Sequence, residues 1–119
     1  MQKSKALEAL SALANPTRLD LVRALMPFGT KGLSAGEIAR MLDMSASRLS
    51  FHLSALEQAS LISSRKAARH VFYAIDTQGL GSVIGYLLND CCGSHPEISA
   101  CCLHPNLSES QTGLTTAEP

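Results

Sequence analysis

The 119-residue chain carries ten Lys and Arg and ten Asp and Glu, and 45% of its residues are apolar. This length fits one domain with a modest core, and no transmembrane helix is expected, because the sequence has no apolar run of 18 residues. The segment Met1–Lys5 leads into alternating apolar and polar residues, which is unlike a signal-peptide core, so a cytoplasmic location is expected.

The charges are unevenly distributed along the chain. Residues 1–75 hold all ten Lys and Arg against five acids, a net charge of +5, whereas residues 76–119 hold five acids and no Lys or Arg, a net charge of −5. Between Met44 and Ile75 the only acid is Glu57, against four Lys or Arg. A basic segment attracts nucleic acid even when the net charge is zero.

Two helices are expected at the start of the chain. Residues 4–13 show apolar residues at helical spacing. Asn15 and Pro16 then mark a second helix, because Asn is a favoured cap and Pro suits the first helical position. This helix is expected to end at Pro27 and to bury an apolar face formed by Leu19, Val22 and Leu25.

The stretch from Ser34 to Ile75 predicts a short helix, a turn, a longer helix and a β-hairpin. Ser34 and Glu37 fit a capping box for the short helix. Asp43-Met44 forms the turn, and Ser45 caps the longer helix. The buried stripe of that helix is predicted to contain Leu49, Leu53 and Leu56.

The polar residues of the longer helix predict a DNA recognition helix. The N-terminal part of such a helix enters the major groove, where Arg48 would read guanine O6 and N7. The alternative is an ordinary helical hairpin with a solvated polar face. The candidate DNA contacts of this region, which fall outside the predicted buried stripe, are Ser45, Ser47, Arg48, Ser50 and His52.

A basic hairpin is predicted after the recognition helix. Leu61–Ser64 and His70–Ile75 are β-prone, and a basic tip, Arg65–Arg69, lies between them. Leu33 is expected to add a short strand beside this hairpin. A positive hairpin suits the neighbouring phosphates of a duplex, and its candidate contacts are Arg65, Lys66, Arg69 and His70.

A last helix is expected from Asp76 or Thr77 to about Asn89. Three glycines interrupt its apolar face, which is costly in an isolated helix but permits close contact with another helix.

In order and spacing, these elements resemble the ArsR/SmtB family of winged-helix repressors over residues 5–89. The resemblance is carried by the recognition-helix and hairpin segments and by an earlier helix junction, namely residues 45–56, 61–62, 65–66, 69–73 and 13–19. It departs from the family at Ala68, where such hairpins often carry Gly. It implies a mainly α fold with a small β-hairpin, a homodimeric winged helix-turn-helix, and an operator that is an imperfect inverted repeat.

In the resembled family the first and last helices form the dimer interface. The apolar residues of this chain that fit the role are Leu7, Leu10, Leu80, Val83, Ile84, Leu87 and Leu88. The alternative is that both faces pack within the monomer.

All four cysteines fall within twelve residues, as the pairs Cys91-Cys92 and Cys101-Cys102. Clustered thiols in a cytosolic chain suggest soft-metal binding or redox chemistry over structural disulfides. The spacing is not the C-x-x-C pattern of structural zinc sites. The alternative is a dispensable tail with free thiols.

The resemblance suggests which ion the thiols bind. The family's arsenic site, a C-x-C in the helix before the recognition helix, is absent from residues 37–42, and its zinc site on the last helix lacks His. What remains is similar to family members with thiols after the last helix. As(III), with Sb(III) as an alternative, is therefore the expected inducer, bound by Cys91, Cys92 and one of Cys101 or Cys102.

Other functions stay open. A divalent soft metal such as cadmium, zinc or mercury would add His95 or His104 as ligands, and vicinal thiols could instead act as a redox switch. A small thiol- or metalloid-handling enzyme is less favoured, because no phosphate loop or Ser-His-Asp set can be placed. The expected organisation is a DNA-binding and dimerisation domain (1–89), a sensor segment (90–105) and a disordered tail (106–119).

Overall fold

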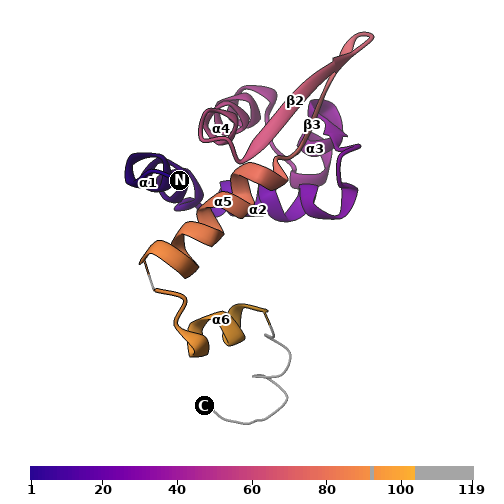
Figure 1. Ribbon diagram of the computed structural model, residues 1–119. Coiled ribbons are helices and arrows are strands. Elements are labelled where there is room, and N and C mark those ends of the chain that lie inside the picture. The colour runs from indigo at the N-terminus through magenta and orange to yellow at the C-terminus, as the bar shows by residue number, and fades with distance from the viewer. Residues whose placement is uncertain (92, 104–119) are drawn as a thin grey trace. The chain divides into compact units, whose positions relative to one another are not determined.

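The computed structural model describes residues 1–91 and 93–103 and divides the chain into two compact units, Met1–Val83 and Ile84 onward. Figure 1 shows the elements in chain order. They are α1 (Lys3–Leu13), α2 (Pro16–Leu25), the 3₁₀ turn η1 (Met26–Phe28), β1 (Leu33–Ser34), α3 (Ala35–Leu42), α4 (Ala46–Gln58), β2 (Ile62–Ala67), β3 (His70–Ile75), α5 (Thr77–Gly85), the π-helical η2 (Tyr86–Cys91) and α6 (Pro96–Leu103). None of the helices in these ranges is long and apolar enough to cross a membrane.

Helices α2, α3 and α4 begin at side-chain caps, as the sequence predicts. The Asn15 side chain accepts hydrogen bonds from the amides of Thr17 and Arg18, at 2.9 and 3.2 Å. Ser34 and Glu37 form the complete capping box at the start of α3. These caps satisfy amides that the helix itself leaves free, and they confirm the predicted helix starts.

The buried face of α2 differs from the prediction. Leu25 is buried as expected, but Leu19 is 53% exposed and Val22 is only partly buried, while Leu21 is fully buried. The stripe that faces the core therefore runs through positions 21 and 25, one helical turn apart. The prediction for Leu19 is wrong. Helix α2 carries leucines on two faces, and the face with Leu21 packs against the core.

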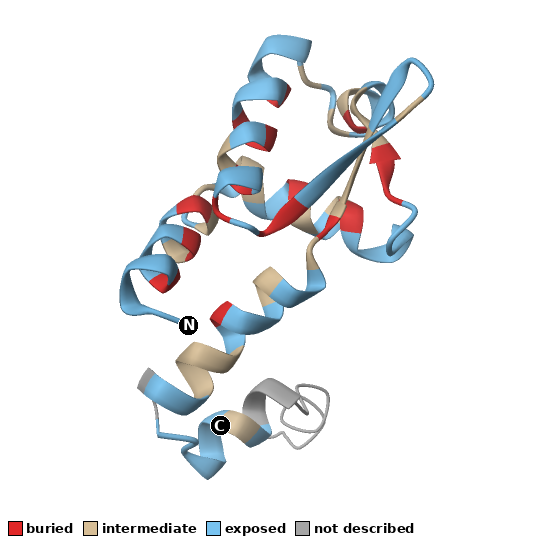
Figure 2. Ribbon diagram, turned by 45° about the horizontal axis from the view of Figure 1, so that its top comes forward, coloured by how far each residue is buried: buried red, intermediate tan, exposed pale blue. Residues whose placement is uncertain are grey.

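The core of the first unit forms where α4 meets the N-terminal helices and the base of the sheet. Leu49, Leu53 and Leu56 are at most 2% exposed, which confirms the predicted stripe of α4. Helix α1 contributes three buried alanines, Ala6, Ala9 and Ala12. Figure 2 shows these buried positions on the inner faces of the helices, whereas the far end of the hairpin is exposed.

The sheet has three antiparallel strands in the order β1-β3-β2. Leu33 pairs with Tyr73, so the short strand predicted beside the hairpin is confirmed. Strand β2 extends further than predicted, because Arg65 and Lys66 pair with β3 and do not belong to the tip. The tip is the two-residue turn Ala68-Arg69.

Ala68 adopts a positive φ of 57°. A side chain disfavours this backbone region, which glycine occupies readily. The departure at Ala68 therefore leaves the hairpin intact and places a strained residue at its tip.

Helix α5 begins as predicted, with the Asp76 carboxylate accepting a hydrogen bond from the Gly79 amide at 3.0 Å. Gly79 lies against the turn between α4 and β2, where an added Cβ would collide with the Ser60 carbonyl oxygen. A Cβ added at Gly81, by contrast, would meet nothing within 4 Å. Gly79 is therefore required for the close approach of α5 to that turn. The glycines of this helix were expected to allow close contact with another helix, whereas Gly79 contacts a turn.

The second unit starts in the last turn of α5 and continues through η2 to α6. Gly93 and Ser94 both have positive φ, and the Ser94 amide donates a hydrogen bond to the Leu88 carbonyl, so the chain turns after η2. Pro96–Leu103 then form α6. Residues 92 and 104–119, including His104 and the expected disordered tail, lie outside the described residues, and the predicted domain boundaries stay predictions.

Candidate nucleic-acid interface

The N-terminal half of α4 presents polar side chains to solvent. Ser45 caps the helix by accepting a hydrogen bond from the Arg48 amide at 3.3 Å. Ser47, Arg48 and Ser50 are all exposed, while the leucines of the opposite face are buried. The helix thus separates a polar surface from its core stripe, as a helix that enters a DNA groove must.

His52 does not belong to that polar surface. It is only 9% exposed and lies among the buried leucines of α4, so the prediction that it falls outside the stripe is wrong. Its Nδ1 accepts a hydrogen bond of 3.2 Å from the Arg18 Nε–H. Burial, followed by the positive charges of Arg18 and Arg48, lowers the pKa of His52 below its usual value of 6.5. A neutral, buried His52 holds α4 against α2.

Arg18 is a residue that the analysis of the sequence missed. Besides binding His52, its guanidinium lies 5.6 Å from the ring centroid of Phe51, which is 66% exposed on α4. This cation–π contact and the hydrogen bond fix one arginine of α2 against the recognition helix. The spacing of His52 relative to Leu49 and Leu56 is the signal that could have revealed this contact.

The hairpin carries several positively charged side chains, and they differ in whether they are free to contact phosphate. Lys66, Arg69 and His70 are exposed. Arg65 is exposed but already engaged, because its Nη2 donates to the Lys31 carbonyl at 2.9 Å and its guanidinium lies 4.9 Å from the Phe72 ring centroid. Lys66 and Arg69 are therefore the freer candidates for phosphate contacts.

Glu57, the only acid between Met44 and Ile75, lies away from the candidate DNA contacts on α4. Glu57 accepts a short hydrogen bond of 2.6 Å from the Ser64 hydroxyl on β2. It lies in the last turn of α4, whereas Ser47 and Arg48 lie in the first. Two other acids lie nearer to the start of α4, because Asp20 and Asp43 line a small pocket together with Arg48.

The cysteine site is described only through its backbone. Cys91 is the last residue of η2, and Cys101 and Cys102 lie in α6. Their side chains, and all of Cys92, lie outside the described residues. Within the part that is described, no group of three His, Cys, Asp or Glu could hold a metal ion. The donor set itself, four thiols, suits a soft or thiophilic ion.

A family model described as a helix-turn-helix domain matches residues 13–65. The transcriptional regulator YgaV of Escherichia coli K12 is 34% identical over 88 residues, which cover 74% of this chain and 87% of YgaV. The chain belongs to the helix-turn-helix transcriptional regulators. Its winged-helix fold is of the ArsR/SmtB type, and it acts in DNA-binding transcription regulation.

Two solved structures support this assignment. HlyU from Vibrio cholerae N16961, a transcriptional activator, has a TM-score of 0.60 and 35% identity, and the match covers 77% of this chain and 99% of HlyU. A protein described as a possible transcriptional regulator for arsenical resistance has a TM-score of 0.57 and 35% identity, covering 65% of this chain and 77% of that chain. These similarities favour a transcriptional regulator over the enzyme alternative.

Proposed function

We propose that this regulator is a homodimeric repressor that releases its operator when trivalent arsenic, or antimony, binds its C-terminal thiolates. The observation that carries the proposal is the position of the cysteines. Cys91 and Cys92 follow directly on the helical run that starts at Thr77, and a second pair lies ten residues further on. The arsenical-resistance description of one similar structure supports the same inducer.

DNA binding would use the exposed side of α4 and the hairpin. Arg48 and Ser47 would contact bases or nearby backbone, and Lys66 and Arg69 would contact phosphates. Arg65 would serve mainly to brace the hairpin, because its guanidinium already binds Lys31 and Phe72. His52 would act from within, by holding α4 in place.

Dimerisation would bring two such surfaces to an inverted-repeat operator, with half-site centres about one helical turn apart or a multiple of it. Helix α1 supports this arrangement, because its alanine face is buried in the monomer while Leu7 is 56% exposed. On α5, Ile84 is 42% exposed, but Val83 is 2% exposed and already part of the monomer core. Val83 is therefore removed from the set of interface residues; Leu7, Leu10, Leu80, Ile84, Leu87 and Leu88 remain.

Coupling would run along the chain from the thiols to α5. An ion that joins Cys91 and Cys92 to a cysteine of α6 would fix the turn at Gly93 and Ser94 and constrain the end of the helical run. The ion need only favour the form that cannot bind DNA, and a coupling free energy of about 1–3 kcal/mol is typical.

A DNA-release screen tests this proposal. The operator is first selected from randomised duplexes, and the complex is then titrated with arsenite, antimonite, cadmium, zinc, mercury and peroxide. Release by arsenite and antimonite at lower concentrations than by the divalent ions or peroxide is expected. Release by a divalent ion or by peroxide alone would contradict the arsenic proposal. A reporter gene behind the operator distinguishes repression from activation.

A further inference from the structure

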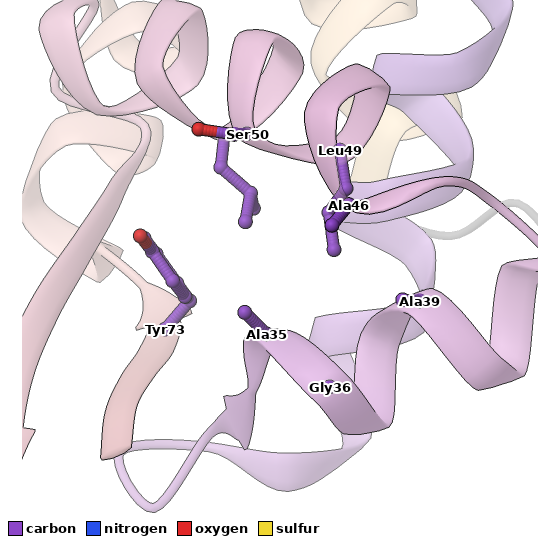
Figure 3. A pocket seen from close by; sticks show the side chains of 8 residues that line it. Ala35, Gly36, Ala39, Ala46, Leu49, Ser50 and Tyr73 are labelled. Carbon is purple, nitrogen blue, oxygen red and sulfur yellow. The ribbon is translucent and has the colours of Figure 1, made fainter. Parts of the chain in front are cut away.

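A hollow of about 160 Å³ lies where α3, α4 and β3 meet. Figure 3 shows it between the start of α3, the first turns of α4 and the Tyr73 side chain. The hollow opens to solvent beside α4, because Gly36, Ala46 and Ser50 in its lining are exposed. An apolar hollow with a few polar groups is the usual form of a site for a small molecule.

The hollow exists because small residues line it on two helices. Ala35, Gly36 and Ala39 of α3 face Ala46 of α4 across the space. A Cβ added at Gly36 would meet nothing nearer than the Arg40 side chain, at 3.6 Å. Longer apolar side chains at these positions would fill the gap, so the volume follows directly from the sequence.

The lining is mostly hydrocarbon and contains no charged residue. Its two hydroxyls come from Ser50 on α4 and Tyr73 on β3, and Figure 3 shows the hydroxyl end of Tyr73 pointing toward α4. Burial, together with the charge of Glu57, raises the pKa of Tyr73, which therefore stays a neutral phenol and a hydrogen-bond donor. Among the described residues, the Tyr73 hydroxyl forms no hydrogen bond with another side chain or the backbone.

We propose that this hollow binds a small, uncharged and mainly apolar molecule, about one aromatic ring in size, with one group that hydrogen-bonds Tyr73 or Ser50. The size follows from the volume, since an apolar cavity of about 150 Å³ is known to hold benzene. The neutrality follows from the lining, because a charged molecule would lose part of its hydration there without meeting an opposite charge.

Occupancy would affect DNA binding, because Ser50 belongs to the exposed surface of α4. This consequence rests on the proposed function, whereas ligand binding itself does not. The test of the site therefore uses the full-length protein without DNA, and its failure would leave the repressor proposal untouched.

The probe is benzyl alcohol, which is neutral, and the comparison is benzoate, which is similar in size but negatively charged. Titrations followed by backbone amide NMR should show saturable binding of benzyl alcohol in the millimolar range, as expected for so small a ligand. The shifts should centre on residues 35–39, 46–53 and 73. Benzoate should bind at least ten times more weakly. No saturable shift with benzyl alcohol, or equal binding of both probes, would overturn the proposal.

Two pairs of matched variants locate the site. Ala39→Leu should fill the hollow and weaken benzyl alcohol binding at least tenfold, while Ala24→Leu, a half-buried alanine on α2 outside the hollow, should not. Tyr73→Phe should weaken binding several-fold, while Tyr86→Phe removes the chain's other phenol without effect. Tyr73→Phe keeps the test decisive if Ala39→Leu fails to fold. Equal affinities within both pairs would contradict the site.

Discussion

Arg18 on α2 donates a hydrogen bond from its Nε to Nδ1 of His52 on α4, at 3.2 Å. An arginine cannot accept a hydrogen bond, so Nδ1 of His52 must be free of a proton and the imidazole must be neutral. The contact joins the recognition helix to the helix behind it, and it depends on the protonation state of a single buried side chain.

The free energy of unfolding should therefore fall in mild acid, because His52 becomes protonated there. Its pKa is lowered in the folded protein by burial and by Arg18 and Arg48, so the unfolded chain binds more protons in the pH window between the two pKa values. The stability that neutral His52 contributes is complete above the pKa of the unfolded chain, near 6.5. This stability is lost as the pH falls through the pKa of His52 in the folded protein.

The measurement is the urea midpoint of the wild type and of His52→Asn, which keeps an acceptor but does not titrate. The advantage of the wild type at pH 7 should shrink toward pH 5. A difference in midpoint that stays constant with pH would exclude this role of His52.

The close contact of α5 with the turn at Ser60 is tested by two glycines of the same helix. Gly79→Ala should lower the free energy of unfolding by roughly 3 kcal/mol, because its Cβ collides with the Ser60 carbonyl. Gly81→Ala should raise it by about 0.5–1 kcal/mol, because the site is open and alanine favours a helix. Chemical denaturation measures both; equal effects would show that α5 does not rest on this turn.

Readout of bases and contact with phosphates should separate in two variants. Arg48→Ala should cost about 1–3 kcal/mol of operator binding and relax specificity, whereas Lys66→Ala should weaken all duplexes alike and flatten the salt slope by about one unit. Arg23→Ala, an exposed arginine on α2, is the control. Fluorescence anisotropy at several salt concentrations gives these values, and unchanged affinity in both test variants would refute the assignment.

The dimer face is tested by two leucines with similar exposure. Leu7 on α1 is 56% exposed and belongs to the proposed interface, whereas Leu19 on α2 is 53% exposed and does not. Leu7→Glu should bury an unpaired charge on association and yield monomers, while Leu19→Glu should stay dimeric. Sedimentation velocity at micromolar concentration measures both, and a dimeric Leu7→Glu protein would count against the interface.

Local chemistry was predicted well from the sequence. The caps at Asn15, Ser34 and Ser45 depend on residues within one helical turn, and all three form. The short strand at Leu33 beside the hairpin was also predicted, and Leu33 pairs with Tyr73.

Choices between competing faces were harder to predict. His52 stands at helical spacing with Leu49, Leu53 and Leu56, but its polarity argued for the surface, and only the partner Arg18 on another helix makes its burial favourable. For α2, spacing alone could not decide between Leu19 and Leu21. The hollow beside Tyr73 depends on small residues from two helices and a strand, so it becomes visible only when they are brought together.

The central claim is that thiols at the end of the helical run from α5 control operator release. The most direct measurement is arsenite-induced release of labelled operator DNA from the wild type and from a Cys91→Ser/Cys92→Ser double variant, followed by fluorescence anisotropy. Both proteins should bind the operator with equal affinity before arsenite is added. The account predicts that arsenite releases the wild type and leaves the double variant bound. Release of the double variant at the wild-type arsenite concentration would contradict it.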